Sequence, residues 1–525
     1  MPIRMKKDAG QKRSNNRRPS NSMRSGGRSG GGVGINVISM LLPFLLKKPK
    51  LLIIVAIVGV VAYLFLGKGC SSSSLPLDQI SQLFSTGNSF NKEAYESVEI
   101  YEPLADNVKN PLPEKVSLLK YAPKRLNQGR QGSCVAWASA YAARTILESQ
   151  RTGKSPNSVR FSPSFMYNQI STDKNSCQGS YIKLAMDNMM GVGAVPFNDF
   201  KYDDRSCSKT PSRQLKTQAQ AFKIKGFQRL TEEDARFASK EMLAIKQNLA
   251  QGSPVIIGMM VGGTFMSKMS GREVWIPSES DYNQRGFGGH AMCIIGYDDY
   301  KEGGAFQIMN SWGKDWGIDG VGWIRYTDFK HFNIESYGLY PMGNIEDKNE
   351  TVFKGGFSLQ LNSGQKSMNL EQVGDFYFET TQKINISDKF KVEYTNNVEC
   401  YTYIFGQETD GSSYVLFPYT PKHSPYCGIT GTRLFPRDYS MQADDKGEKD
   451  KIAVIITKKP MDYNEMNALI SNASGISYEE KVKNALVNTR EKNVQFKGKS
   501  TISFIASTND NKRIAFVIGI KKNNQ

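Results

Sequence analysis

The sequence predicts an α+β protein in which two folded domains follow an apolar N-terminal segment. At 525 residues the chain is longer than a single hydrophobic core usually spans. Helical and strand-like patterns are mixed between residues 112 and 343, which predicts an α+β domain there. From residue 352 to residue 525, short runs of alternating apolar residues predict an all-β, sandwich-like domain with one helical insert at 463–487. Residues 344–351 are polar and are expected to link the two domains.

An uncharged apolar run, LLIIVAIVGVVAYLFLG, occupies residues 51–67. Its length is at the short end of the range for a membrane-spanning helix. A cleaved signal peptide is the alternative, but such a peptide has a much shorter charged lead and is followed by a small-residue cleavage site. The lysines within residues 47–50 place the N-terminus in the cytoplasm. We therefore expect a single transmembrane signal-anchor, a stalk at 68–111, and both folded domains on the periplasmic or extracellular side.

The basic character of the chain is concentrated in its first fifty residues. The net charge is +18, and residues 1–50 contribute +11 of it through twelve lysines and arginines and one acid, Asp8. Because this tail is rich in Arg, Ser and Gly, we expect it to be disordered. A basic tail also suits nucleic-acid binding. Its position directly before the apolar run favours a role in membrane orientation instead, so no nucleic-acid partner is expected.

The stretch NQGRQGSCVAWA, residues 127–138, places a cysteine at the start of a helix-forming run. A helix N-terminus favours the thiolate form of Cys134 and presents backbone N–H groups that can hold an oxyanion. A buried structural cysteine is the alternative interpretation, because free cysteine is among the most buried residue types. Cys134 is therefore a candidate nucleophile that requires a base elsewhere in the chain.

The chain has only three histidines, and their neighbourhoods separate their roles. His331 is expected at the surface, and His423 lies in a proline-bounded loop of the β-rich domain. His290, in GFGGHAMCIIGYDD, has glycines before it and an apolar strand behind it that would hold the ring rigidly. Twenty residues later, NSWGKDWG supplies Asn310 to orient the imidazole and Trp312 to shield that hydrogen bond from water. The sequence therefore predicts that His290 is the base.

With these motifs in this order, residues 112–343 resemble the papain family of cysteine peptidases. LPEKVSLL at 112–119 is similar to the start of the mature enzyme, and CQGS at 177–180 is similar to the family's substrate-binding segment. The resemblance implies a two-lobe fold with a helical lobe and a β-barrel-like lobe. It also implies catalytic roles for Cys134, His290, Asn310 and the oxyanion-hole residue Gln128, and substrate contacts at Gly179, Ser180, Gly289 and Trp312.

Three positions depart from the family's pattern, and one of them is Ser180, which stands where a substrate-binding glycine would be. Gln131 stands where the family usually has a cysteine, and Val135 stands where an aromatic residue usually follows the nucleophile. The resemblance implies that Cys177 and Cys207 pair with each other in a disulfide. Residues 71–111 show no pattern like the family's inhibitory propeptide, which leaves the control of activity open.

The remaining cysteines have less specific surroundings. Pairing of Cys400 with Cys427 in the β-rich domain is one possibility and free thiols are the other. Cys293 lies on the strand after the base and is expected in the core, and Cys70 is left beside the apolar run. The chain has no CxxC motif and no cluster of histidines, so we expect no metal site and no cofactor.

These observations together predict a membrane-anchored cysteine peptidase, most simply an endopeptidase, that acts on protein or peptide substrates outside the cytoplasm. A catalytically inactive papain-like scaffold that binds peptides or partners is the alternative, and the presence of all four catalytic residue types argues against it. SYVLFPYT at 413–420 resembles part of a domain of unknown function that is appended to bacterial exported proteins. That resemblance favours a bacterial source and makes the C-terminal domain a candidate for binding a protein or cell-envelope partner.

Overall fold

The computed structural model describes residues 3–8, 87–105, 109–232, 239–340, 352–363, 366–437, 439–507 and 511–523. The chain divides into two units, one formed by Met1–Asp8 with Leu77–Gln525 and the other by Ala9–Pro76. The apolar run at 51–67 and Cys70 lie outside the described residues, so the predicted anchor lies outside them as well. Within the described ranges, no helix combines the length and the apolar character that a membrane crossing needs.

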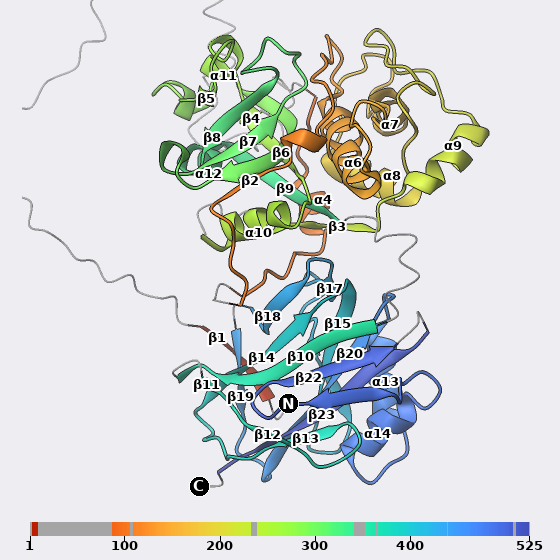
Figure 1. Cartoon of the computed structure of the whole chain (residues 1–525), viewed down its shortest axis with the longest axis vertical. Helices are drawn as coiled ribbons and strands as arrows, with labels where there is room; N and C mark the ends of the chain where they lie inside the picture. The colour runs from red at the N-terminus through yellow and green to blue at the C-terminus, as the bar shows by residue number, and fades with distance from the viewer. Residues whose placement is uncertain are drawn as a thin grey trace, which may run out of the picture. The chain divides into compact units, whose positions relative to one another are not determined.

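One long helix runs through the first lobe of the N-terminal folded region (Figure 1). It begins at Cys134 and continues without a break, because the sequence from 134 to 152 contains neither glycine nor proline. It ends at Gly153, whose φ of 66° is the left-handed conformation that closes many helices. The helices of this lobe are α5 (Cys134–Ala136), the π-helical η2 (Trp137–Arg144), α6 (Thr145–Thr152), α7 (Pro163–Ile170), α8 (Ile182–Gly191), α9 (Arg213–Ala219) and η3 (Gln220–Phe222).

The second lobe is a mainly antiparallel sheet with strand order β3-β9-β4-β6-β7-β8-β5, in which β2 also pairs with β6. Its central strands β4 and β6 are buried almost throughout, as their apolar sequences require. The predicted division into a helical lobe and a β-rich lobe is therefore observed. The strands are β2 (Lys115–Ser117), β3 (Gly226–Arg229), β4 (Val255–Val261), β5 (Val274–Trp275), β6 (Gly288–Asp298), β7 (Ala305–Met309), β8 (Val321–Arg325) and β9 (Asn333–Tyr340). The helices that accompany them are η1 (Leu119–Tyr121), α10 (Ser239–Ala250), α11 (Gly263–Ser267), η5 (Asp281–Asn283), η6 (Lys301–Gly303) and α12 (Tyr326–Phe332).

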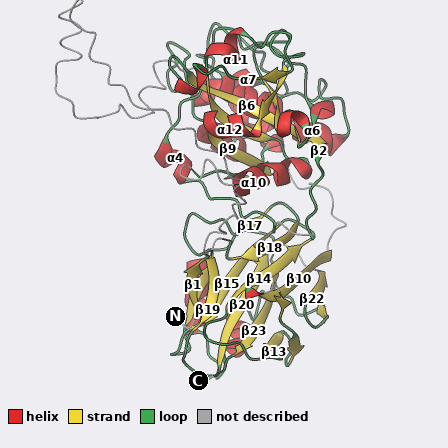
Figure 2. Ribbon diagram, turned by 90° about the vertical axis from the view of Figure 1, so that its left-hand side faces the viewer, coloured by secondary structure: helices red, strands yellow, loops and turns green. Residues whose placement is uncertain are grey.

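The C-terminal region contains two sheets that share one core, and strands make up most of it (Figure 2). The first sheet has the order β1-β19-β14-β10-β22-β21, with β11 and β18 paired at its side, and the second has the order β12-β13-β23-β20-β15-β16, with β17 beside β15. Phe357 of one sheet stacks on Phe516 of the other with ring centres 3.7 Å apart, so the predicted sandwich is observed. The strands are β10 (Val352–Leu361), β11 (Lys366–Ser367), β12 (Leu370–Gln372), β13 (Tyr377–Thr380), β14 (Lys389–Asn396), β15 (Cys400–Gln407), β16 (Ser413–Phe417), β17 (Tyr426–Cys427), β18 (Gly431–Phe435), β19 (Tyr439–Ala443), β20 (Lys449–Thr457), β21 (Val494–Lys497), β22 (Ile502–Ser507) and β23 (Arg513–Lys521).

The sandwich is not purely β. Two helices, α13 (Tyr463–Asn472) and α14 (Tyr478–Ala485), occupy the predicted helical insert. Their apolar faces pack on residues of β15, β20 and β23, where they form a second core on the outer side of that sheet. Cys400 and Cys427 are directly opposite each other on β15 and β17, and both are free thiols in the structure.

Residues 3–7 form a strand, β1 (Ile3–Lys7), at the edge of the first sheet. β1 pairs antiparallel with β19, and the backbone N–H of Ile3 donates to the Tyr414 hydroxyl at 3.0 Å. Ile3 is only 1% exposed, because it extends the core of the sandwich. The prediction of a disordered tail at 1–50 therefore does not hold for these five residues, whose alternating apolar side chains suit an edge strand.

Residues 87–105 also differ from the predicted stalk. They include α4 (Lys92–Glu96) and the deeply buried side chains of Tyr95 and Tyr101. Ile100 forms isolated bridges with Arg229 of β3 and with His423 of the C-terminal region. This stretch is part of the folded structure, because its few apolar residues fill gaps in the surrounding surface.

Candidate active site

Cys134 is the first residue of α5 and is completely buried. Its Sγ accepts a hydrogen bond from the backbone N–H of Ala291, at 3.4 Å. Burial raises the pKa of Cys134 to about 12, although the backbone N–H groups of Ala291, Val135 and Cys134 itself act in the opposite direction. In this arrangement the thiol is protonated at neutral pH.

His290 lies on β6 and is also completely buried. Its Nε2 shares a hydrogen bond of 2.8 Å with the Oδ1 of Asn310, and the Trp312 ring stacks over it with centres 4.4 Å apart. Asn310 Oδ1 also accepts the backbone N–H of Ser311 at 2.7 Å, which fixes the direction of the amide. Burial lowers the pKa of His290 to about 4, against the opposing effect of the Asn310 hydrogen bond, so the ring is neutral.

The two lobes bring the thiol and the imidazole into one place. The residue whose N–H reaches the Cys134 sulfur, Ala291, directly follows His290 on β6. Within the described part of the chain, His290 Nδ1 has no hydrogen-bond partner, while Nε2 is held by Asn310. A neutral histidine with one nitrogen anchored and the other available is what activation of a cysteine nucleophile requires.

Gln128 is tied to both lobes. Its Oε1 accepts the Ser311 hydroxyl at 2.6 Å, and its Nε2 donates to the carbonyl of Gln131 at 2.9 Å. Tyr202 holds the same loop from the other side, since its hydroxyl donates to the Gln128 carbonyl and also bonds the Ser133 hydroxyl, both at 2.7 Å. Sequence reasoning did not single out Tyr202 as a residue that holds this loop, although it lies in FKYDDRSC at 200–207, a stretch that resembles the family, whereas Ser311 lies inside NSWG.

The predicted disulfide between Cys177 and Cys207 is present. It anchors the turn before Cys134, because the backbone N–H of Gly132 donates to the Cys177 carbonyl at 3.1 Å. Gln131, which replaces the usual cysteine, is buried and donates to the carbonyl of Asp203 at 3.2 Å. A hydrogen bond thus replaces a covalent tie at this position.

Residues 87–90 lie across this site through their main chain. Asn88 N–H donates to the Gly289 carbonyl at 3.2 Å, and Ser89 N–H donates to the Ser180 carbonyl at 2.8 Å. The Ser180 N–H donates in turn to the Gly87 carbonyl at 3.0 Å, and Asn88 and Ser180 form a parallel bridge. The predicted substrate-contacting residues Ser180 and Gly289 therefore hold a segment of the chain itself.

Gly87 and Gly179 fit this close contact because neither has a side chain. A Cβ on Gly87, whose φ is +122°, would lie 2.5 Å from the backbone of Gly132, two residues before Cys134. A Cβ on Gly179 would lie 3.3 Å from the Ser89 hydroxyl. The covering segment is thus packed against the turn that carries the nucleophile, which accounts for the burial of Cys134 and His290.

One functional candidate was missed by the sequence analysis. Glu335, on β9, is 3% exposed and accepts a hydrogen bond of 3.0 Å from the side-chain amide of Asn88. Its other oxygen accepts the Tyr337 hydroxyl at 3.0 Å. A single glutamate in the strand NIESYGLY matches no motif, so the sequence could not single it out.

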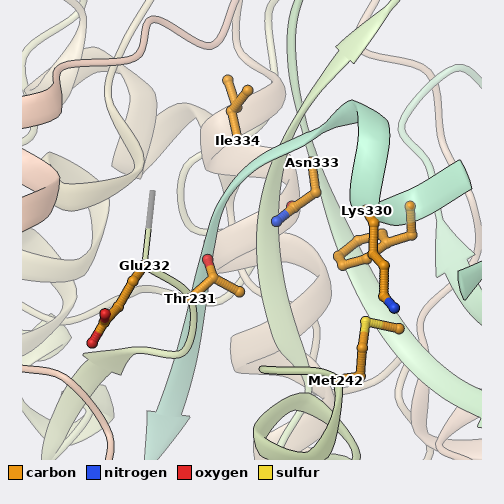
Figure 3. Close-up of a pocket in the computed structure, with 7 residues that line it drawn as sticks. Thr231, Glu232, Met242, Lys330, Asn333 and Ile334 are labelled. Atoms are coloured by element: carbon orange, nitrogen blue, oxygen red, sulfur yellow. The ribbon is translucent and has the colours of Figure 1, made fainter. Parts of the chain in front are cut away.

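Figure 3 shows a pocket at the start of β9, none of whose lining residues is one of the predicted catalytic or substrate-contacting residues. It contains no cysteine or histidine, which argues against a second nucleophilic site there. Within the described ranges, no group of three or more His, Cys, Asp or Glu side chains is arranged to hold a metal ion. The pocket is lined by Thr231, Glu232, Met242, Phe329, Lys330, Asn333 and Ile334.

Comparison with known proteins agrees with this geometry. Residues 117–342 match the model of the papain family cysteine proteases. This region is similar to the papain family of cysteine peptidases. Residues 384–460 match a domain of unknown function, DUF4384, so the recognition of both regions from the sequence is confirmed.

Several curated proteins are similar to the papain-like domain. An uncharacterized peptidase C1-like protein of Acanthamoeba polyphaga mimivirus is 26% identical over 42% of this chain and 70% of its own length. Mouse (Mus musculus) cathepsin K is 25% identical over 44% of this chain and 65% of its own length. Among solved structures, xylellain, a cysteine protease from Xylella fastidiosa, is 26% identical over 49% of this chain and 96% of that chain, with a TM-score of 0.41.

In the papain-like domain, neighbouring side chains accommodate the residues that depart from the family pattern. Val135 is buried in the first turn after the nucleophile. Trp137, two residues later, packs its ring against Tyr141 and Tyr202 with centres 4.6 and 4.8 Å away. The aromatic bulk is therefore present on the helix, displaced along it, and it supports the tyrosine that holds the Gln128 loop.

Proposed function

We propose that residues 112–343 hydrolyse peptide bonds in protein or peptide substrates, with Cys134 as nucleophile and His290 as its base. One observation carries the proposal. His290 Nε2 is hydrogen-bonded to Asn310, and the Trp312 ring stacks on the imidazole. Ala291, the residue after His290, donates its backbone N–H to the Cys134 sulfur. This arrangement places the orienting group on the base, and it places the residue that follows the base on the sulfur of the nucleophile.

The chemistry follows from these positions. His290 takes the thiol proton, and the thiolate of Cys134 attacks the substrate carbonyl carbon. The backbone N–H of Cys134 and the Nε2 of Gln128 hold the resulting oxyanion, and Gln128 leaves its contact with Gln131 to do so. His290 then gives the proton to the leaving amine. A water molecule, deprotonated by His290, releases the acyl group and regenerates the thiol.

Activity requires residues 87–90 to leave the cleft. While they are in place, burial keeps the thiol and the imidazole neutral, and Ser180 and Gly289 are occupied. The described arrangement is therefore a closed state of the proposed peptidase. The covering segment supplies the control that the sequence left unassigned.

We further propose that residues 51–67 anchor the chain in a membrane, with the peptidase outside the cytoplasm. Support comes from the apolar run and the basic residues before it. A single crossing puts residues 3–7 and the C-terminal region on opposite sides, so β1 must leave β19 when the anchor inserts. Cysteine labelling of a Met5→Cys variant in sealed vesicles tests this. Residue 5 should react only from the cytoplasmic side, and reaction from the other side would overturn the proposed topology.

An active-site label tests the peptidase. Full-length protein with Gly87→Ala, which displaces the covering segment, should react at Cys134 with an epoxysuccinyl peptide and should hydrolyse peptides. Addition of Cys134→Ala should abolish both signals. The matched control is Gly191→Ala, because a Cβ there meets no atom within 4 Å. Folded protein that neither labels nor cleaves would support the inactive scaffold instead.

A further inference from the structure

The strand β1 lies along the outer edge of the first sheet of the C-terminal region, beside β19 (Figure 2). The Ile3 side chain is buried in the core that the two sheets share, and Met5 packs partly against the same core. Arg4 and Lys6, which alternate with them, are exposed. β1 is therefore bound to the sandwich by its main chain and by the apolar residues of one face.

Polar side chains of the sandwich bind both ends of this short stretch. At one end, the Tyr414 hydroxyl accepts the backbone N–H of Ile3 at 3.0 Å. At the other end, the Asp8 carboxylate accepts Lys391 Nζ at 2.7 Å and the Ser440 hydroxyl at 2.5 Å. Lys391 also donates to backbone carbonyls of the sandwich, which fix the position of its ammonium group. The edge thus accepts an apolar side chain at the position of Ile3 and a carboxylate at the position of Asp8.

The proposed membrane anchor takes β1 away from this edge. Residues 3–7 precede the apolar run at 51–67 and the C-terminal region follows it, so insertion of the run places the bilayer between them. The backbone of β19 then loses the strand that pairs with it, and the site of the Ile3 side chain opens. An unpaired sheet edge beside an apolar opening binds extended chains readily. The β1 of a second anchored copy lies on the far side of the bilayer as well and cannot fill the edge.

Resting on the anchor proposed above, we propose that the β19 edge binds an extended segment of a partner protein outside the cytoplasm. The segment adds antiparallel to β19, as β1 does. It carries apolar residues at the positions of Ile3 and Met5 and a carboxylate at the position of Asp8. Its main chain supplies the pairing with the sheet, and these three side chains supply the selectivity. The proposal gives a binding role to the region that matches DUF4384, because β19, Lys391 and Tyr414 all lie within residues 384–460.

A fluorescent peptide with the sequence of residues 2–9, PIRMKKDA, tests the proposal on full-length protein in sealed vesicles with the C-terminal region outside. The peptide should bind saturably. Ile3→Asn in the peptide should weaken binding roughly tenfold or more, because it removes the buried apolar side chain. Asp8→Asn should weaken it by a similar factor, because it removes the charge-assisted bond to Lys391.

The matched control peptide carries Arg4→Asn, at an exposed position, and should bind as tightly as the parent peptide. Attraction of a basic peptide to the membrane surface gives the reverse order, because it depends on Arg4 and not on Ile3. That order of affinities would overturn the proposal, and so would the absence of saturable binding.

Cysteine cross-linking tests whether the peptide occupies this edge in the register of β1. An Arg4→Cys peptide should form a disulfide, on mild oxidation, with Gln442→Cys protein, because the two positions are directly opposite. It should not form one with Tyr439→Cys protein, because residue 439 is opposite residue 7. Equal cross-linking of both proteins, or of neither, overturns the proposal. A Gln442→Cys protein that links to a second copy instead would assign the edge to self-association and overturn it as well.

Failure of the anchor is distinguishable from failure of the docking site. Labelling of Met5→Cys from the side of the C-terminal region overturns both, because β1 then holds the edge itself. Labelling from the cytoplasmic side without peptide binding overturns the docking site and leaves the anchor standing. Thermal unfolding of the two cysteine variants of β19 shows that the compared proteins are folded.

Discussion

Residues 87–90 are held in a different way from residues 96–105 and 109–110, which follow them in the chain. The first part is held by its main chain, through three backbone hydrogen bonds to Ser180 and Gly289. Such contacts are available to almost any sequence, as a cleft that accepts many peptides requires. The side chain of Asn88, bonded to Glu335, is the exception.

The described residues of the second part are held by particular side chains of the C-terminal region. Glu102 is buried and bonds His423 Nδ1 at 2.6 Å, and its carbonyl accepts from Arg433. Asn110 both donates to and accepts from the backbone of Thr432. These contacts depend on residue identity. The comparison therefore separates main-chain contacts near Cys134, which do not depend on side-chain type, from contacts with the C-terminal region, which do.

The largest expected effect comes from removing an oxyanion donor. This change leaves in place both the contacts of residues 87–90 and the contacts with the C-terminal region. Gln128→Ala in the Gly87→Ala protein removes one oxyanion donor and should lower kcat by roughly 10²–10³, with measurable turnover left. The rate of Cys134 labelling should change far less, because the label forms no oxyanion of this kind. Steady-state hydrolysis beside labelling kinetics measures both. An equal fall in the two rates would mean that Gln128 supports the loop and supplies no oxyanion donor.

The stability of the protein should depend on pH through Glu335, the partner of the Asn88 side chain. The main-chain contacts around Asn88 involve no titratable group. The pKa of Glu335 is raised to about 7 in the fold, above its ordinary value, so the folded state binds the proton more tightly than the unfolded state. Its contribution to stability is present at about pH 4.5 and is lost as the pH rises through 7. At about 1.4 kcal/mol per pKa unit this is about 3 kcal/mol.

Urea unfolding at pH 5 and pH 8 measures that contribution. The difference in unfolding free energy between the two pH values should be smaller in Glu335→Gln than in the parent protein. Glu393→Gln is the matched control. A pH dependence that is identical in all three proteins would contradict the assigned environment of Glu335.

Much of the papain-like domain could be predicted from the sequence, because its chemistry needs fixed residue types at fixed spacings. Cys134, His290 and Asn310 were predicted from the glycine, tryptophan and helix patterns that surround them, and the structure bonds His290 to Asn310 and the next residue, Ala291, to the Cys134 sulfur. The disulfide of Cys177 with Cys207 followed from the family resemblance. Motifs of this kind can be recognised in a sequence because tight backbone turns and close contacts accept only a few residue types.

The contacts of the covering segment could not be predicted in the same way. Main-chain hydrogen bonds, such as those of Asn88 and Ser89, leave no mark on residue type. Tyr95 and Tyr101 are single apolar residues in a polar stretch, and only the shape of the surface that receives them makes them part of the core. β1 is an edge strand of five residues, too short to stand out within a basic tail.

A smaller effect should come from displacing the first part of the segment. Gly87→Ala places a Cβ against the backbone of Gly132 at a φ of +122°, which is a strain of roughly 1–3 kcal/mol. The closed state should lose that amount, so labelling of Cys134 should accelerate roughly tenfold to a hundredfold. Gly191→Ala should label at the parental rate. Equal rates for the two variants would show that residues 87–90 do not limit access.

The smallest expected effect tests whether the two parts of the segment act independently. Glu102→Gln replaces the charged partner of His423 with a neutral one of the same size, which should cost roughly 1 kcal/mol in the contacts with the C-terminal region. Because Ser180 and Gly289 still hold residues 87–90, labelling of Cys134 should rise by no more than a few fold. Labelling as fast as in Gly87→Ala would break the comparison, since it would mean that the contacts with the C-terminal region are what keep the cleft closed. The double variant decides between these cases, because independent contacts give additive free-energy changes and coupled contacts do not.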